Sequence, residues 1–369
     1  MPFAWLALLP LNYVVVKGYN KLLHMLGPIS LLGFTTLLVS VLNVVTAMYV
    51  QTTPILSFLQ FTLKDIYILL MFQQLWSVIH VTIKLKEAKY LYGFIFGIGG
   101  LGSFMGSFLT SRFATVLGSE NLLFFTPVIY LVYCALFIML VALSKKHTGC
   151  KSLDMFTEPK GDTSNGFQLV GKSRYLQYIL VIVVAMQLTT TLVEYQFNHY
   201  LELTYPEQDP RTAFQGQLFS WVNGITALMQ FFGSAAFVHL LGLVRAQIFM
   251  PVILTGFAIG NVIFPTFGMM SVAYGSIKSL DYSIFRVATE MLYIPLTVQE
   301  KFKAKAVIDV FAYRSAKALG SFIVLALQFC FPLSVHEAIN YGAFAVLVLW
   351  LFATYGISKE KEHPHFITT

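Results

Sequence analysis

The stretch SRYLQYILVIVVAMQLTTTLVEYQFNHYL, residues 173–201, decides the fold class. It is longer than one bilayer crossing, since about 20 apolar residues in a helix span the hydrocarbon core. A carboxylate, Glu194, interrupts its second half, and Gln187, one of two adjacent threonines and Asn198 recur on the same side of a helix. The stretch therefore predicts a membrane-spanning helix with one polar side.

Similar apolar runs flank this stretch in both directions and make the chain an all-α integral membrane protein. Of its 369 residues 57% are hydrophobic and only 11% are charged, against about 25% charged in soluble domains. This composition excludes a soluble globular enzyme and a disordered chain. Eleven spans are predicted, at approximately 2–22, 27–49, 55–82, 87–113, 121–144, 173–201, 212–240, 243–263, 267–296, 303–331 and 334–357.

One long polar segment, residues 145–171, separates the first five spans from the last six. It predicts three parts. Residues 1–144 form an N-terminal five-helix bundle, residues 145–171 a cytosolic linker, and residues 172–369 a C-terminal six-helix bundle with a short cytosolic tail.

The basic residues between the spans predict the topology. With the linker in the cytosol, 17 of these lysines and arginines lie inside and only Arg112 and Arg211 lie outside, as the positive-inside rule requires. We expect a multi-pass protein of the inner (cytoplasmic) membrane with its N-terminus outside and its C-terminus cytosolic. Five plus six spans become two halves of six if a helix before Met1 is missing, which predicts a major-facilitator-like two-bundle fold.

Charged residues inside the spans are the candidates for function, because a charge at the bilayer centre costs about 2.5–3.5 kcal/mol on insertion scales. Lys278 with Asp281 and Arg286 with Glu290 have the spacing of pairs on one helix face, which favours a structural role. Arg314 lies near the cytosolic end of its span and is expected to join a latch between bundles.

Glu194 and Lys317 have no partner at close spacing on their own helices. We expect both to line a central cavity, Glu194 with the stripe of Gln187 and Asn198. The alternative is a Glu–Lys bridge between helices that only holds the bundle together. Small residues around Lys317, in SAKALGSF, leave room for a ligand or another helix.

No motif of enzyme chemistry accompanies these charges. The run GIGGLG at 97–102 follows no strand, and its glycines fit close helix packing better than dinucleotide binding. The three cysteines are scattered and the histidines show no H-E-x-x-H pattern. We expect no enzyme, no cofactor, no metal site and no nucleic-acid partner, and we expect a monomer in the lipid bilayer.

Four stretches carry a family resemblance: LKEAKYLYGFIFGIGG at 85–100, TLVEYQFNHYLELTYPEQDPRTAFQGQLFSWVNGI at 191–225, FRVATEMLYIPLTVQEKFKAKAVIDV at 285–310 and AKALGS at 316–321. They resemble the nucleotide transporter family, the ATP/ADP translocases of plastids and intracellular bacteria, which is related to the major facilitators. The resemblance implies twelve spans, exchange of ATP for ADP or a related nucleotide activity, and charged residues in spans that contact phosphates. It matches Glu194 to the family's L-V-E glutamate and Lys317 to its G-K-S-G-G lysine.

The chain departs from the family pattern at two places. Gln73-Gln74 precedes Leu75-Trp76 where the family has a glutamate. The family also has a lysine near the start of its second span, which should fall around Ala4 or Trp5, but no basic residue occurs before Lys17. The candidate substrate-binding residues are Lys317, Glu194, Gln74, Gln187, Arg286, Arg314, Asn198 and Lys278.

The sequence thus predicts a secondary transporter or exchanger that carries nucleotides, or a related phosphorylated anion, by alternating access. Two alternatives stay open: a divergent major-facilitator carrier for another solute, and a membrane scaffold that transports nothing.

Overall fold

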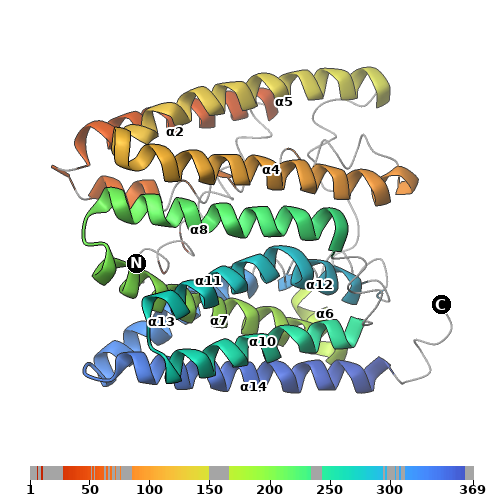
Figure 1. Ribbon diagram of the computed structural model, residues 1–369. Helices are drawn as coiled ribbons and strands as arrows, with labels where there is room; N and C mark the ends of the chain where they lie inside the picture. The colour runs from red at the N-terminus through yellow and green to blue at the C-terminus, as the bar shows by residue number, and fades with distance from the viewer. Residues whose placement is uncertain are drawn as a thin grey trace. The chain divides into compact units, whose positions relative to one another are not determined.

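The computed structural model consists of helices joined by turns (Figure 1), and its described residues contain no strand. Described are residues 28–50, 85–148, 166–233, 243–293 and 312–361, with scattered positions at 6, 10, 52–75, 296 and 304–308. The chain forms two compact units. Unit 1 comprises residues 1–6, 93–109 and 162–369, and unit 2 comprises residues 7–92 and 110–161.

Unit 2 is built on two apolar helices, α2 (Pro28–Tyr49) and α5 (Thr126–Thr148), the second preceded by the short 3-10 turn η1 (Asn121–Phe125). Leu32 of α2 packs against Phe137 and Val141 of α5, and all three are buried. Neutral polar contacts reinforce this packing, because Thr36 and Tyr67 share a hydrogen bond of 2.8 Å.

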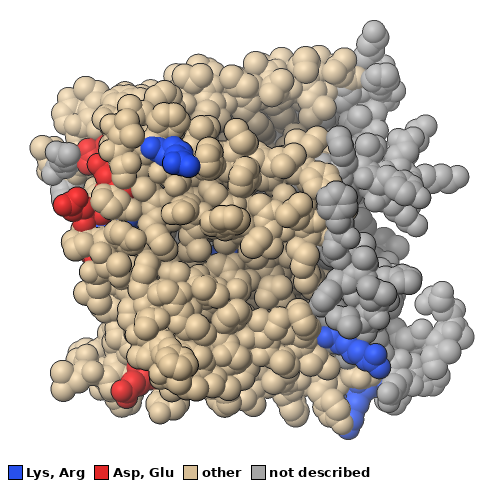
Figure 2. All heavy atoms as spheres, in the orientation of Figure 1, with Lys and Arg blue, Asp and Glu red and all other residues tan. Residues whose placement is uncertain are grey.

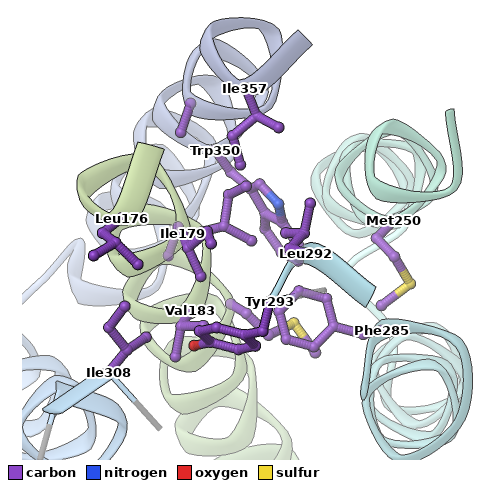
Figure 3. Close-up of a cluster of buried hydrophobic side chains, with 14 of the residues drawn as sticks. Leu176, Ile179, Val183, Met250, Phe285, Leu292, Tyr293, Ile308, Trp350 and Ile357 are labelled. Atoms are coloured by element: carbon purple, nitrogen blue, oxygen red, sulfur yellow. The ribbon is translucent and has the colours of Figure 1, made fainter. Parts of the chain in front are cut away.

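Unit 1 holds the longest buried helix, α7 (Arg174–Thr204), which follows the short α6 (Gly166–Lys172) and packs against α11, α13 and α14. Its N-terminus is capped, since Ser173 accepts a hydrogen bond from the Leu176 amide. Trp350 is fully buried at the centre of the core cluster in Figure 3. The helices that pack against α7 are α11 (Phe267–Leu280), α13 (Tyr313–Cys330) and α14 (Val335–Lys361), and α10 (Leu243–Ile263) packs in turn against α11 and α14.

The middle of α4 (Leu85–Leu117) also belongs to unit 1, where it packs against α8 (Gln208–Leu228) and the π turn η2 (Met229–Gly233). A Cβ atom at Gly97 would lie 2.1 Å from the Phe231 ring, and one at Gly100 would lie 3.0 Å from Ala227 Cβ. Glycine is thus needed for close packing at these two positions. The same role expected of Gly102 is wrong, because a Cβ there would meet nothing within 4 Å.

Several predicted spans coincide with apolar helices. Four described helical segments are long and apolar enough to cross a membrane: Ser30–Tyr49, Asn121–Leu143, Arg174–Thr204 and Val335–Lys359. Two shorter apolar helices, Gln247–Ile263 and Ser315–Cys330, accompany them. Spans 2–22 and most of 55–82 lie outside the described residues, so the count of eleven stays a prediction.

The described helices expose many large apolar side chains, among them Leu37 (65%), Trp221 (68%) and Phe352 (68%). On the face in Figure 2 most of the described surface is uncharged. An apolar surface of this extent fits a lipid surrounding, because soluble monomers rarely expose large contiguous apolar patches.

The predicted span 267–296 is not one regular helix. After α11 the backbone widens into a π turn, η3 (Asp281–Phe285), and continues as α12 (Arg286–Leu292). A π turn inserts one extra residue into a helix and rotates the side chains that follow it. The interruption begins at the buried Asp281, three residues after Lys278.

Candidate functional site

The central feature of unit 1 is an ion pair between two buried helices. Lys278 Nζ of α11 lies 3.3 Å from Glu194 Oε2 of α7, and the two side chains are 13% and 15% exposed. The helices are antiparallel, since Phe197 stacks on Phe267 near one end and Tyr175 donates a hydrogen bond to the Leu292 carbonyl near the other. The cross-helix bridge that the sequence left open as the alternative for Glu194 exists, with Lys278 as its partner.

Neighbouring side chains hold the pair in place. The Lys278 ammonium lies 5.5 Å from the Tyr274 ring centroid, a cation–π distance, and that ring stacks on Phe197 at 4.4 Å. Asn198 Nδ2 donates a hydrogen bond to the Glu194 carbonyl oxygen at 2.7 Å, and Asn198 Oδ1 accepts one from Gln215 Nε2 at 3.3 Å. Asn198 therefore lies next to Glu194 on α7 and links it to Gln215 of α8.

Helix α13 lies parallel to α7 and approaches it closely at a glycine. A Cβ atom at Gly320 would lie 3.0 Å from Thr191 Cβ and 3.4 Å from a Leu188 methyl group. One helical turn earlier lies Lys317, which is partly buried. Because the two helices are parallel, this position brings Lys317 to the level of Gln187 and Leu188 on α7.

The polar stripe of α7 is only partly exposed to solvent in this structure. Gln187 is 3% and Thr191 0% exposed, and Thr191 donates to the Gln187 carbonyl oxygen at 2.8 Å. The contact with Gly320 closes this part of the stripe against α13. Glu194 and Asn198, nearer the end of α7, keep partial exposure.

On the N-terminal side of the stripe along α7, unit 1 contains a partly open cavity of about 140 Å³. It combines aromatic rings with a carboxylate and a guanidinium group. Its lining residues are Val183 of α7, Asp281, Tyr282 and Phe285 of η3, Arg286 and Thr289 of α12, and Tyr313 of α13. Val183 precedes Gln187 by one turn, so the cavity continues the side of α7 that carries the polar stripe.

The expected pairing of Lys278 with Asp281 is wrong. Lys278 pairs with Glu194, while Asp281, 8% exposed, lines the cavity. The π turn that starts at Asp281 explains the difference, because regular i, i+3 geometry ends there. Arg286 is exposed beside the cavity, and the side chain of its expected partner Glu290 lies outside the described residues.

Two further predicted site residues cannot be placed in this arrangement. Gln74 lies outside the described residues. Arg314 lies in the first turn of α13, next to Tyr313 of the cavity, and its side chain is likewise outside the description.

Sequence reasoning did not identify the aromatic lining of the cavity. Tyr282, Phe285 and Tyr313 are ordinary members of apolar runs, and their convergence depends on η3 and on the packing of α13 against α7. The one sequence signal that could have located this lining was the charged Asp281 inside a span, because it lies next to Tyr282. In chemical terms the arrangement can bind a ligand that has a ring and an anionic group, and we find no nucleophile–base pair among its described residues.

Comparisons with known proteins identify the family to which the chain is similar. A family model described as TLC ATP/ADP transporter matches residues 59–275 and 262–361. The ADP,ATP carrier protein 1 of Chlamydia pneumoniae is 28% identical over 230 residues, which are 57% of this chain and 44% of that protein.

Rickettsial relatives are similar to the same extent. The ADP,ATP carrier protein 1 of Rickettsia bellii is 26% identical over 220 residues, 53% of this chain and 44% of that protein. The ADP,ATP carrier protein 4 of Rickettsia felis is 24% identical over 225 residues, 54% of this chain and 44% of that protein. The matched part of the chain thus spans somewhat under half the length of these curated relatives.

Proposed function

The chain belongs to the TLC ATP/ADP transporter family, and on this premise we propose that it exchanges nucleotides across a membrane by alternating access. The observation that carries the proposal is the family match, which extends from residue 59 to residue 361. The relatives are named ADP,ATP carriers, so a nucleotide such as ATP or ADP is the substrate that we assign, and the chain acts as a carrier with no enzyme activity.

The buried charges of unit 1 support the proposal. Lys317 is placed on α13 at the level of the polar stripe, where it can act as a phosphate ligand. At an effective dielectric constant near 20, a pair at about 4 Å is worth roughly 4 kcal/mol before desolvation. Arg286, Arg314 and Lys278 supply further positive charge, and the amides of Gln187, Asn198 and Gln74 supply hydrogen bonds.

The Lys278–Glu194 pair gives the transport cycle a gate. Both groups are mostly buried, so leaving one of them unpaired would be costly. A substrate phosphate can replace the Glu194 carboxylate as the partner of Lys278. The new pair then offsets the energetic cost of separating Lys278 from Glu194. In this cycle α7 and α11 separate only when an anion is bound, which is the behaviour of an exchanger.

We propose the topology of the sequence analysis for this carrier. The protein is a multi-pass monomer of the inner membrane, with segment 145–171 and the C-terminus in the cytosol and the N-terminus outside. Its helices form a five-helix and a six-helix bundle of the major-facilitator kind. The partition of 17 basic residues against two supports this orientation.

Uptake into proteoliposomes tests the function. Vesicles that hold the purified chain and internal ADP should take up labelled ATP, whereas vesicles without internal nucleotide should take up little. Arg286→Gln should reduce uptake several-fold because it removes a positive charge beside the cavity. Arg245→Gln, which changes an exposed arginine at the start of α10, is the matched control and should leave uptake unchanged.

Two outcomes would overturn the proposal. Uptake that is independent of internal nucleotide would argue against exchange. Absence of nucleotide uptake by correctly folded protein would favour a carrier for another solute or a scaffold, and a comparison of solutes would then separate these two.

A further inference from the structure

The size of the cavity at η3 limits what it can hold. Its volume is about 140 Å³, close to that of an engineered cavity of about 150 Å³ that binds benzene. Pockets that enclose a whole drug-sized ligand measure roughly 300–1,000 Å³. The cavity therefore takes one ring system and leaves the rest of a nucleotide outside.

The lining of the cavity suits a flat ring. Tyr282, Phe285 and Tyr313 present aromatic surface, and every nucleobase has a π face that stacks on such side chains. Phe285 is 5% exposed and meets the Trp350 ring edge-on, with centroids 5.5 Å apart and an interplanar angle of 78°. This contact fixes one wall of the cavity before any ligand arrives.

Asp281 adds a polar group that needs a donor. Its side chain is more than nine-tenths buried and lines the cavity. Among the residues that the structure describes, the carboxylate accepts no hydrogen bond and lies within 4 Å of no basic group. Lys278 and Arg286 act on it only through charge, and the Lys278 ammonium is paired with Glu194. The oxygens of the carboxyl group can accept hydrogen bonds, so they match a ligand that has an N–H group.

We infer that this cavity receives the base of the transported nucleotide and that Asp281 accepts a hydrogen bond from an amino group on that base. The inference rests on the proposed nucleotide transport and adds a base-selective site to it. Basic residues lie where the phosphates would emerge. Arg286 is exposed beside the cavity, and Lys317 follows Tyr313 by four residues, about 6 Å along α13.

Competition binding to the purified full-length chain in nanodiscs tests the inference. Labelled ATP is displaced by ATP, by the triphosphate of unsubstituted purine riboside, which lacks the amino group, and by inorganic tripolyphosphate. The wild-type chain should bind ATP about 10- to 100-fold more tightly than the unsubstituted purine nucleotide, the range expected for a hydrogen bond to a charged group.

Asp281→Asn should reduce this preference to less than tenfold, because a neutral acceptor makes a weaker hydrogen bond. It should leave the affinity for tripolyphosphate within about twofold of wild type. Glu337→Gln, an exposed carboxylate in the first turn of α14, is the matched control and should keep the wild-type preference.

Tyr313→Leu provides a second arm that does not depend on how the chain tolerates a change at Asp281. This variant should bind both nucleotides several-fold more weakly and keep its affinity for tripolyphosphate unchanged, because only the contacts with the ring are lost. An undiminished preference for ATP in Asp281→Asn, or an equal loss of tripolyphosphate in Tyr313→Leu, would overturn the inference.

The same assay separates this inference from the proposed function. Equal binding of ATP and the unsubstituted purine nucleotide by the wild-type chain would contradict the base site and leave nucleotide transport standing. A wild-type chain that binds neither ATP nor tripolyphosphate would contradict nucleotide transport itself, and the base site with it.

Discussion

The two units differ in the polar groups that they bury. In unit 1 a lysine and a glutamate form an ion pair between helices, and a carboxylate lines a cavity. In unit 2 the buried polar side chains of the described residues are neutral, as in the hydrogen bond between Thr36 and Tyr67. Neutral pairs are enough to hold apolar helices together, so the charges of unit 1 require another explanation.

The energetic cost of the charges points to function. The net contribution of one hydrogen bond to the stability of the fold is about 1 kcal/mol. In contrast, replacing a buried ion pair by apolar residues often leaves the stability unchanged or raises it. A bundle selected for stability alone would gain little from Lys278 and Glu194. The exchange that we propose gives them a role, because its gate would open for an anion.

The largest effect on stability is expected where one partner of the ion pair is removed. Lys278→Met should lower the free energy of unfolding by about 3–5 kcal/mol, because Glu194 would remain as an uncompensated buried charge. Chemical denaturation of the purified chain measures this loss. The double variant Lys278→Met/Glu194→Leu should recover most of it, and an equal loss in the double variant would argue against a direct pair.

A smaller effect is expected at the contact between α7 and α13. Gly320→Ala should cost about 1–3 kcal/mol of stability, because the new methyl group would lie 3.0 Å from Thr191, whose branched side chain cannot move away easily. Gly33→Ala on α2 of unit 2 is the matched control. A Cβ atom there meets nothing within 4 Å, so alanine should stabilise by up to about 1 kcal/mol. Equal effects at the two glycines would contradict the close approach of α13.

The smallest effect is expected in unit 2. Tyr67→Phe removes the hydroxyl group that bonds Thr36 and should cost about 1 kcal/mol of stability. ATP uptake should stay at the wild-type level once expression is matched. A strong loss of uptake by a folded Tyr67→Phe protein would mean that neutral polar pairs also serve transport.

The sequence predicts the helices well where a span is regular. The run 27–49 becomes α2, from Pro28 to Tyr49, and the run 243–263 becomes α10 with the same bounds, because apolar length and flanking breakers set these ends. The interruption of 267–296 could not be predicted, since neither proline nor glycine occurs in the π turn at Asp281–Phe285. Its local sequence, DYSIF, is compatible with a regular helix.

Some charged residues of the candidate site could be predicted, whereas its aromatic lining and its geometry could not. The rule that intramembrane charges are costly identified Glu194, Lys278 and Arg286. Spacing along one helix suggested Asp281 as the partner of Lys278, but the choice of Glu194 depends on the antiparallel packing of α7 and α11. Contacts between helices 84 residues apart in sequence cannot be read from one chain without knowing which helices are neighbours.

Equilibrium binding of labelled ATP to the purified chain tests the central claim, that the basic residues of unit 1 hold the phosphates of a nucleotide. We predict saturable binding that Lys317→Gln weakens at least about fivefold, because even 1 kcal/mol of the net interaction changes affinity by that factor. Lys317→Arg should weaken binding less, since it keeps the charge, and Lys359→Gln, at an exposed lysine near the end of α14, should bind as the wild type does. Undiminished ATP binding by a folded Lys317→Gln protein would contradict the claim.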